Sequence, residues 1–151
     1  MTAREEYELW TLLNQVNDGM LRVRDKELRP LSVSTVQVAI LYALAKGGQP
    51  MTQTEVAGWV FRRPHTVAAA LRRMEERGLV VQSREVGGKR QMRVEMTEKG
   101  SSLFRRQHRR REAVPRVLNS LDAGERRQLR SLLRRLRART MVELAAKPPS
   151  P

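Results

Sequence analysis

The chain has 151 residues, no cysteine and a formal net charge of +14 at pH 7. The absence of cysteine excludes disulfides, thiol redox sensing and cysteine-ligated zinc, and two histidines are too few for most transition-metal sites. With 40% hydrophobic and 30% charged residues and no apolar run of bilayer-spanning length, the composition excludes membrane-embedded and disordered proteins. We therefore expect a cytoplasmic protein without metal or cofactor, because the N-terminus also lacks the layout of a signal peptide.

The positive charge is concentrated in one part of the chain. Residues 1–50 carry six basic and six acidic side chains, so residues 51–151 carry the other 24 basic and 10 acidic ones, and with them the whole +14. Such a field attracts phosphate and steers association with nucleic acid. Charge alone leaves open an arginine-rich surface that serves only solubility.

Residues 3–29 are predicted to form one long helix. Thr2 and Glu5 have the spacing of a capping box, and Pro30 closes the segment. Apolar residues recur at three- and four-residue steps and make a stripe along the helix: Leu9, Leu12, Leu13, Val16, Met20 and Val23.

A second helix is predicted from Ser34 to about Lys46. Ser34 and Gln37 mark its start, and Gly47-Gly48 followed by Pro50 ends it. Its expected buried side consists of Val38, Ile40, Leu41 and Leu44.

Residues 51–78 have the pattern of a helix-turn-helix. Thr52 and Glu55 form another capping box, and the short helix that follows is interrupted at Phe61-Arg62-Arg63. Pro64 opens the next helix, because its fixed φ is helical and its missing N–H is not needed there. Gly78 is free to take the left-handed conformation that ends helices. The predicted buried face of this second helix is Val67, Ala70, Leu71 and Met74.

A β-hairpin is predicted after Gly78. Leu79-Val80-Val81 begins the first strand, and Gly87-Gly88 supplies the turn. Met92, Val94 and Met96 alternate with polar residues in the returning strand. A hairpin directly after a helix-turn-helix indicates a winged helix-turn-helix.

The helical pattern resumes after Gly100. Residues 101–113 are strongly basic, and the run from Arg105 to Arg111 is expected to lie on a solvated connector helix. The alternative is that one or two of these arginines extend the DNA contact. Pro115 is expected to bend or break this segment. Asp122 and Glu125 then have capping-box spacing. The last helix carries Leu129, Leu132, Leu133, Leu136, Met141, Val142 and Leu144.

The amphipathic helices at the two ends have no core of their own to cover. A symmetric dimer in which terminal helices of two chains pack together is the economical solution. The alternative is that they fold back on their own winged domain. A dimer predicts a palindromic DNA site with half-sites about one helical turn apart.

Five short motifs occur at defined spacings along residues 56–100. They are Val56-Ala57, Thr66-Val67, Met74-Glu75-Glu76-Arg77-Gly78-Leu79-Val80, Arg90 seven residues before Thr97, and Met96-Thr97-Glu98-Lys99-Gly100. With these motifs the chain resembles the MarR family of bacterial transcription regulators. The resemblance implies a homodimer paired through N- and C-terminal helices. It also implies a small aromatic or anionic effector bound between those helices and the winged domain.

The predicted fold is thus mainly α with a small β-hairpin wing. Residues 1–30 are the expected N-terminal dimerisation helix, and residues 31–100 the winged helix-turn-helix DNA-binding domain. Residues 101–146 are the expected connector and C-terminal dimerisation helices. Residues 147–151 are expected to form a flexible tail.

The helix that begins at Pro64 is the predicted recognition helix. N-terminal residues of such helices reach base edges, so His65, Thr66 and Ala69 are the candidate base readers, while Arg62 and Arg63 suit guanine or phosphate. Many MarR relatives carry arginine where this chain has Ala69, so specificity here is expected to depend more on the preceding arginines and on DNA shape. The complete predicted set is Arg62, Arg63, Pro64, His65, Thr66, Ala68, Ala69, Arg72 and Arg73, the last two holding the DNA backbone.

The hairpin supplies a second predicted contact. Lys89 and Arg90 suit insertion into a narrow minor groove, and Arg84 and Arg93 are expected to support the wing or touch phosphate. Gly88 replaces the aspartate that orients the wing arginine in the family, so Arg90 is expected to be held less firmly. A merely solvated hairpin tip is the alternative.

These features predict a dimeric, sequence-specific DNA-binding regulator that represses palindromic promoter sites and is relieved by a small ligand. A low-specificity architectural DNA protein and a winged-helix module that binds an acidic protein are the alternatives. The sequence lacks the phosphate loops and paired nucleophile and base that would indicate an enzyme. Trp10 and Trp59 could line a ligand pocket, although a core position is the expectation for an aromatic residue on an amphipathic helix.

Overall fold

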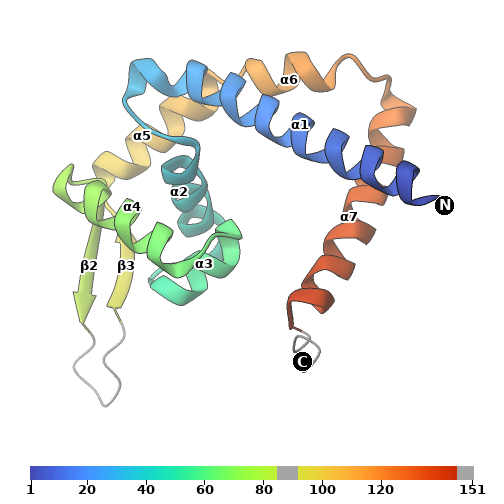
Figure 1. The fold of residues 1–151 in the computed structure, drawn as a ribbon. Coiled ribbons are helices and arrows are strands. Elements are labelled where there is room, and N and C mark those ends of the chain that lie inside the picture. Colours follow the sequence, from blue (N-terminus) through green and yellow to red (C-terminus); the bar gives the residue numbers. More distant parts are fainter. Residues whose placement is uncertain (85–91, 146–151) are drawn as a thin grey trace. The chain divides into compact units, whose positions relative to one another are not determined.

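The computed structural model describes residues 1–84 and 92–145, which form two compact units, Met1–Ala113 and Val114–Pro151. The chain is mainly helical with one small antiparallel sheet, as predicted (Figure 1). Among the described residues no single helix is long and apolar enough to cross a bilayer. Residues 3–31 and 35–47 pass that test only when taken together across an 83° bend.

Helix starts follow the predicted capping boxes. Helices α1 (Ala3–Leu28), α2 (Thr35–Gly47) and α3 (Gln53–Val60) begin after Thr2, Ser34 and Thr52, and each cap exchanges both hydrogen bonds with the residue three positions on. A short 3-10 helix, η1 (Arg29–Leu31), follows α1 and contains Pro30.

The helix-turn-helix consists of α3 and α4 (Pro64–Glu76). Phe61 ends α3 in the left-handed conformation, with φ 54°, and Gly78 follows α4 with φ 68°. The buried residues of α4 are the four predicted ones: Val67, Ala70, Leu71 and Met74. They pack with α2 and α3 into one core that also includes Ile40, Leu41, Val56, Leu79 and Val94.

The wing sheet has three strands rather than the two predicted. Strands β2 (Val80–Arg84) and β3 (Met92–Met96) pair antiparallel, and β1 (Met51–Thr52) pairs with the other edge of β3. A two-residue strand has no alternation that a sequence pattern can reveal, so β1 was missed. The predicted turn at Gly87-Gly88 lies outside the described residues.

Helix α5 (Glu98–Arg109) begins before residue 101 and therefore crosses the expected boundary after Gly100. Thr97 caps it: its hydroxyl accepts from Gly100 N at 3.0 Å and donates to Gly78 O at 2.6 Å. Gly100 is buried here, and a Cβ on it would lie 2.1 Å from Leu79 O. The two halves of the family motif, residues 74–80 and 96–100, therefore meet in space and hold α4, the sheet and α5 together.

The expected break at Pro115 was wrong in position. Helix α5 ends at Arg109, and Pro115 lies within α6 (Ala113–Leu118), near its start. Proline is tolerated in a first helical turn because those N–H groups have no intrahelical partner, so Pro115 helps to open a helix. Arg110 and Arg111 thus lie outside α5, although all the arginines from Arg105 to Arg111 are exposed as expected.

The second unit contains most of α6 and all of α7 (Ala123–Ala145). Asp122 caps α7 reciprocally with Glu125, through N···O distances of 2.7 and 2.9 Å. No residue of α7 is buried, and Leu132, Leu133 and Leu136 are about half exposed.

Candidate nucleic-acid interface

The exposed side of α4 is opposite its four buried residues. His65 and Arg72 are exposed on it, and the partly exposed Ala69 lies between them. Arg62, Arg63 and Pro64 precede the helix and are also exposed, while Thr66 and Ala68 are partly buried at the edges. The structure thus places all the predicted recognition-helix residues on or beside one accessible surface.

The start of α4 is suited to an anion. Arg63 is the N-cap residue, and in the described part of the chain no side chain makes a capping hydrogen bond there. The positive end of the helix dipole is therefore uncovered beside the Arg62 and Arg63 guanidinium groups. At the other end of the same face Glu76 is exposed, which restricts favourable phosphate contacts to the earlier turns.

One side of α4 is attached to the wing. The Glu75 carboxylate accepts hydrogen bonds from Gln82 N at 2.8 Å and Gln82 Nε2 at 3.0 Å. Sequence reasoning did not assign this role to Glu75, because nothing local links it to a residue seven positions away on a strand. The contact links the direction of β2 to that of α4.

The two described wing arginines differ in their surroundings. Arg84 is exposed at the end of β2. Arg93 is partly buried, and its Nη1 lies 4.0 Å from Glu55 Oε2. The Thr52 backbone N–H, the Thr52 hydroxyl and then Arg93 hold the pKa of Glu55 below its usual range. Arg93 therefore faces α3, which fits wing support better than phosphate contact. Lys89 and Arg90 lie outside the described residues.

The other side of α4 is attached to the corner between η1 and α2. Arg77, directly after α4, donates to the carbonyl of Ser32. Lys99 Nζ in turn donates to Arg77 O at 2.7 Å. Arg77 and Lys99 of the motif are thus structural, and they fix the end of α4 between the corner and α5.

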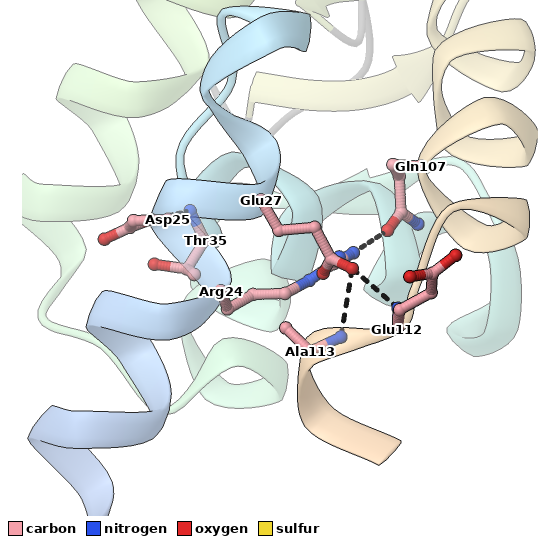
Figure 2. Close-up of polar contacts among 7 residues, drawn as sticks. All are labelled: Arg24, Asp25, Glu27, Thr35, Gln107, Glu112 and Ala113. Carbon is pink, nitrogen blue, oxygen red and sulfur yellow. Dashed lines mark hydrogen bonds and ion pairs between the residues drawn. The ribbon is translucent and has the colours of Figure 1, made fainter. Parts of the chain in front are cut away.

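A polar cluster joins the end of α1 to α5 (Figure 2). The buried Arg24 donates to both Glu27 and Gln107. Glu27 Oε1 also accepts from the backbone N–H groups of Glu112 at 2.6 Å and Ala113 at 3.0 Å. Burial raises the pKa of Glu27, but these two N–H groups and the Arg24 guanidinium together lower it below its ordinary value. No sequence signal identified this cluster, because its partners lie up to 86 positions apart.

The tryptophans are not core residues in the single chain. Trp10 is 63% exposed on α1, and Trp59 is 51% exposed at the end of α3. The indole of Trp59 lies close to Gly47, where an added Cβ would approach it to 2.8 Å. The core expectation was therefore wrong for both. No group of three or more metal-binding side chains occurs within residues 1–84 and 92–145.

Comparison with known proteins supports a DNA-binding assignment. A family model described as a winged helix DNA-binding domain matches residues 33–100. The organohalide-sensing transcriptional regulator RdhR-CbdbA1625, solved with bound 2,4-dichlorophenol, is 28% identical. The match covers 93% of this chain and 86% of that one, with a TM-score of 0.82. A search of curated proteins gave no match.

Two further solved structures share the fold. A MarR-family transcriptional regulator from Rhodococcus sp. RHA1 is 23% identical over 87% of this chain and 93% of its own, with a TM-score of 0.77. A mutant of MarR from E. coli, solved with operator DNA, is 22% identical over 87% of this chain and 95% of its own, with a TM-score of 0.80. These matches are to transcription regulators rather than enzymes.

Proposed function

We propose that the chain is a winged helix-turn-helix transcription regulator of the MarR family and that it acts as a dimeric repressor of palindromic promoter sites. In this proposal α4 enters the major groove of each half-site, and Lys89 and Arg90 of the wing reach the adjacent minor groove. A small aromatic or anionic effector relieves repression.

The uncovered face of α4 is the observation that carries the proposal. It combines an open helix N-terminus, exposed Arg62 and Arg63, and small side chains at Ala68 and Ala69. The guanidinium groups can bind phosphate or a guanine edge, and the alanines allow close approach to bases. The excess positive charge of residues 51–151 favours the same partner.

Exposed apolar stripes support the dimer. On α1, Leu9, Leu12 and Val16 are about half exposed, and α7 has no buried residue at all. Amphipathic helices of this length gain most of their stability when the apolar side is covered. A second copy would cover these stripes and set the distance between two recognition helices.

The effector proposal rests on the relative that was solved with 2,4-dichlorophenol. A ligand of this kind would act by binding more tightly to a conformation in which the two recognition helices are wrongly spaced for successive major grooves. It can shift the population only by its difference in affinity for the two conformations.

Selection of bound sequences from a random DNA pool at near-physiological salt tests the proposal. Recovery of a palindrome with half-sites about one helical turn apart would support the dimeric regulator. High affinity without any preferred sequence would instead favour an architectural DNA protein, and negligible affinity would favour an acidic protein partner.

Substitution at the start of α4 tests the base readers. Arg63→Ala and His65→Ala are each expected to reduce the difference in binding free energy between selected and random DNA by about 1–3 kcal/mol. Arg90→Ala is expected to weaken binding to selected and to random DNA by the same factor, because a wing cation contributes mainly through counterion release. Equal losses on both DNAs for the α4 variants would show that these residues do not read bases.

A further inference from the structure

We propose that a hollow between η1, the start of α2 and α4 seats a phosphate group of the DNA backbone, held by Arg29 and Arg73. The hollow has a volume of about 540 Å³, and its wall includes Asp25, Ser32 and Ser34. This inference rests on the proposed DNA binding. It extends the interface to Arg29, which lies outside the helix-turn-helix and the wing.

The position of Arg73 on α4 points to this role. It lies one helical turn after Ala69, so both side chains project from nearly the same side of the helix. The face centred on His65, Ala69 and Arg72 is the one offered to the bases. Arg73 is therefore at the edge of that face, on the side where Arg77 contacts Ser32 and away from the side attached to the wing.

The dimensions of DNA place a strand at this edge. The major groove is about 12 Å wide, and a helix with its side chains is about 10–12 Å across. A recognition helix in the groove therefore has a sugar–phosphate strand along each edge. One edge of α4 adjoins β2, where Glu75 binds Gln82. The other adjoins the η1–α2 corner, where Arg29 and Arg73 share one hollow.

The wall of the hollow is held by its own hydrogen bonds. Asp25 Oδ1 accepts from Thr35 N at 3.0 Å, and Ser34 and Gln37 cap each other at 3.2 and 3.3 Å. The Ser32 carbonyl accepts from Arg77. Arg29 and Arg73 are exposed, and neither guanidinium has a hydrogen-bond or ion-pair partner among the described residues. Two unpaired cations on a fixed wall suit a bound anion.

Asp25 lies in the same hollow, and its removal is expected to change DNA affinity in the opposite direction to removal of either arginine. Its carboxylate shares the hollow with the two arginines and opposes an incoming phosphate. Asp25→Asn retains the side-chain oxygen that accepts from Thr35 and removes the charge. This variant is expected to bind DNA more tightly, whereas loss of either arginine weakens binding.

The test compares Arg29→Ala, Arg73→Ala and Asp25→Asn with Arg22→Ala. Arg22 is the matched control because it is an exposed arginine on α1 two helical turns before Arg29, on nearly the same side. Affinity for the selected palindrome and for random duplex is measured by fluorescence anisotropy over a range of salt. Thermal melting followed by circular dichroism checks that each variant is folded.

Each arginine variant is expected to reduce the slope of log affinity against log salt by about 0.9, the contribution of one phosphate contact. The affinity for selected and for random DNA should fall by the same factor, because a phosphate carries no sequence information. Asp25→Asn should tighten both, and Arg22→Ala should change neither.

Unchanged salt slopes for Arg29→Ala and Arg73→Ala, in a protein that still binds its palindrome, would overturn this inference and leave the proposed function intact. A wild-type protein that binds no duplex would overturn both. Inorganic phosphate tests whether the hollow binds a free anion instead of a phosphate group of DNA. If millimolar phosphate raises the melting temperature of the wild type but not of the double arginine variant, while DNA slopes stay unchanged, the seat binds a small anion and not DNA.

Discussion

The winged core and the terminal helices both carry apolar side chains at helical spacing, yet these side chains have opposite surroundings. In the core, Ile40, Leu41 and Leu71 have no exposed surface. About half of the surface is exposed for Leu132, Leu133 and Leu136 of α7 and for Leu9, Leu12 and Val16 of α1. Both regions begin their helices with reciprocal caps. The difference lies in what covers the apolar side. Helices α2, α3 and α4 and the sheet cover one another, whereas the apolar stripes of α1 and α7 are exposed in the single chain and would be covered in the proposed dimer.

Replacing one leucine in each region has the largest expected effect. It should distinguish stability that comes from packing within one chain from stability that comes from association of two chains. Leu71→Ala is expected to lower the free energy of unfolding by about 2–5 kcal/mol at every protein concentration, because it leaves a cavity in the core. Leu133→Ala should act mainly by weakening association. Its effect on the melting temperature should therefore depend on concentration.

Chemical denaturation at two protein concentrations, with sedimentation velocity, measures both effects. A concentration-independent loss for Leu133→Ala would mean that α7 packs within its own chain.

A glycine comparison probes the junction that joins the motif halves. A Cβ on Gly100 would lie 2.1 Å from Leu79 O, whereas a Cβ on Gly19 would meet nothing within 4 Å. Gly100→Ala is expected to lower the free energy of unfolding by about 1–3 kcal/mol through overpacking. Gly19→Ala should raise it by about 0.4–1 kcal/mol, because alanine loses less backbone entropy in a helix.

Urea denaturation of the two glycine variants measures whether each change raises or lowers the free energy of unfolding. Equal stability of Gly100→Ala and the wild type would contradict the close approach of α5 to Leu79.

The helix caps offer a smaller test. Thr52 is buried and its hydroxyl caps the first helix of the helix-turn-helix, whereas Thr2 caps the exposed end of α1. Thr52→Ala is expected to cost about 0.5–2 kcal/mol of unfolding free energy. Thr2→Ala should cost less, because that helix end is free to fray.

Hydrogen exchange of the first-turn amides would locate each effect of the cap substitutions. Equal losses of unfolding free energy for Thr52→Ala and Thr2→Ala would imply that the start of α1 is as constrained as the start of α3.

The Glu27 cluster predicts a pH dependence. Its folded pKa lies below the ordinary value of 4.5, so the carboxylate contributes stability above that pH, and this contribution is lost as pH falls through the folded pKa. Glu27→Gln should be less stable than the wild type at neutral pH, and the difference should shrink as the solution is acidified below about pH 4.5.

Denaturant titrations between about pH 7 and about pH 3 measure this difference. Glu98→Gln, on an exposed glutamate paired with Arg105 at 2.9 Å, is the control and should differ little from the wild type. A pH-independent difference for Glu27→Gln would contradict the role assigned to the ionised carboxylate.

Local sequence signals were sufficient to predict the capped helix starts, the helix-turn-helix and the exposed surface of α4. Their signals are local: caps at Thr2, Ser34 and Thr52 lie three residues from their partners, and the buried face of α4 follows helical spacing. The residues predicted to contact DNA followed from that spacing and from the family motif. Whether those side chains touch DNA remains a prediction.

Contacts between distant segments could not be predicted in this way. The pairing of β1 with β3, the contact of Gly100 with Leu79 and the bond from Arg24 to Gln107, 83 residues apart, leave no periodic trace in the sequence. The same is true of the hollow shared by Arg29 and Arg73. Such contacts depend on how several elements pack at once, and each arginine looks locally like any other exposed cation.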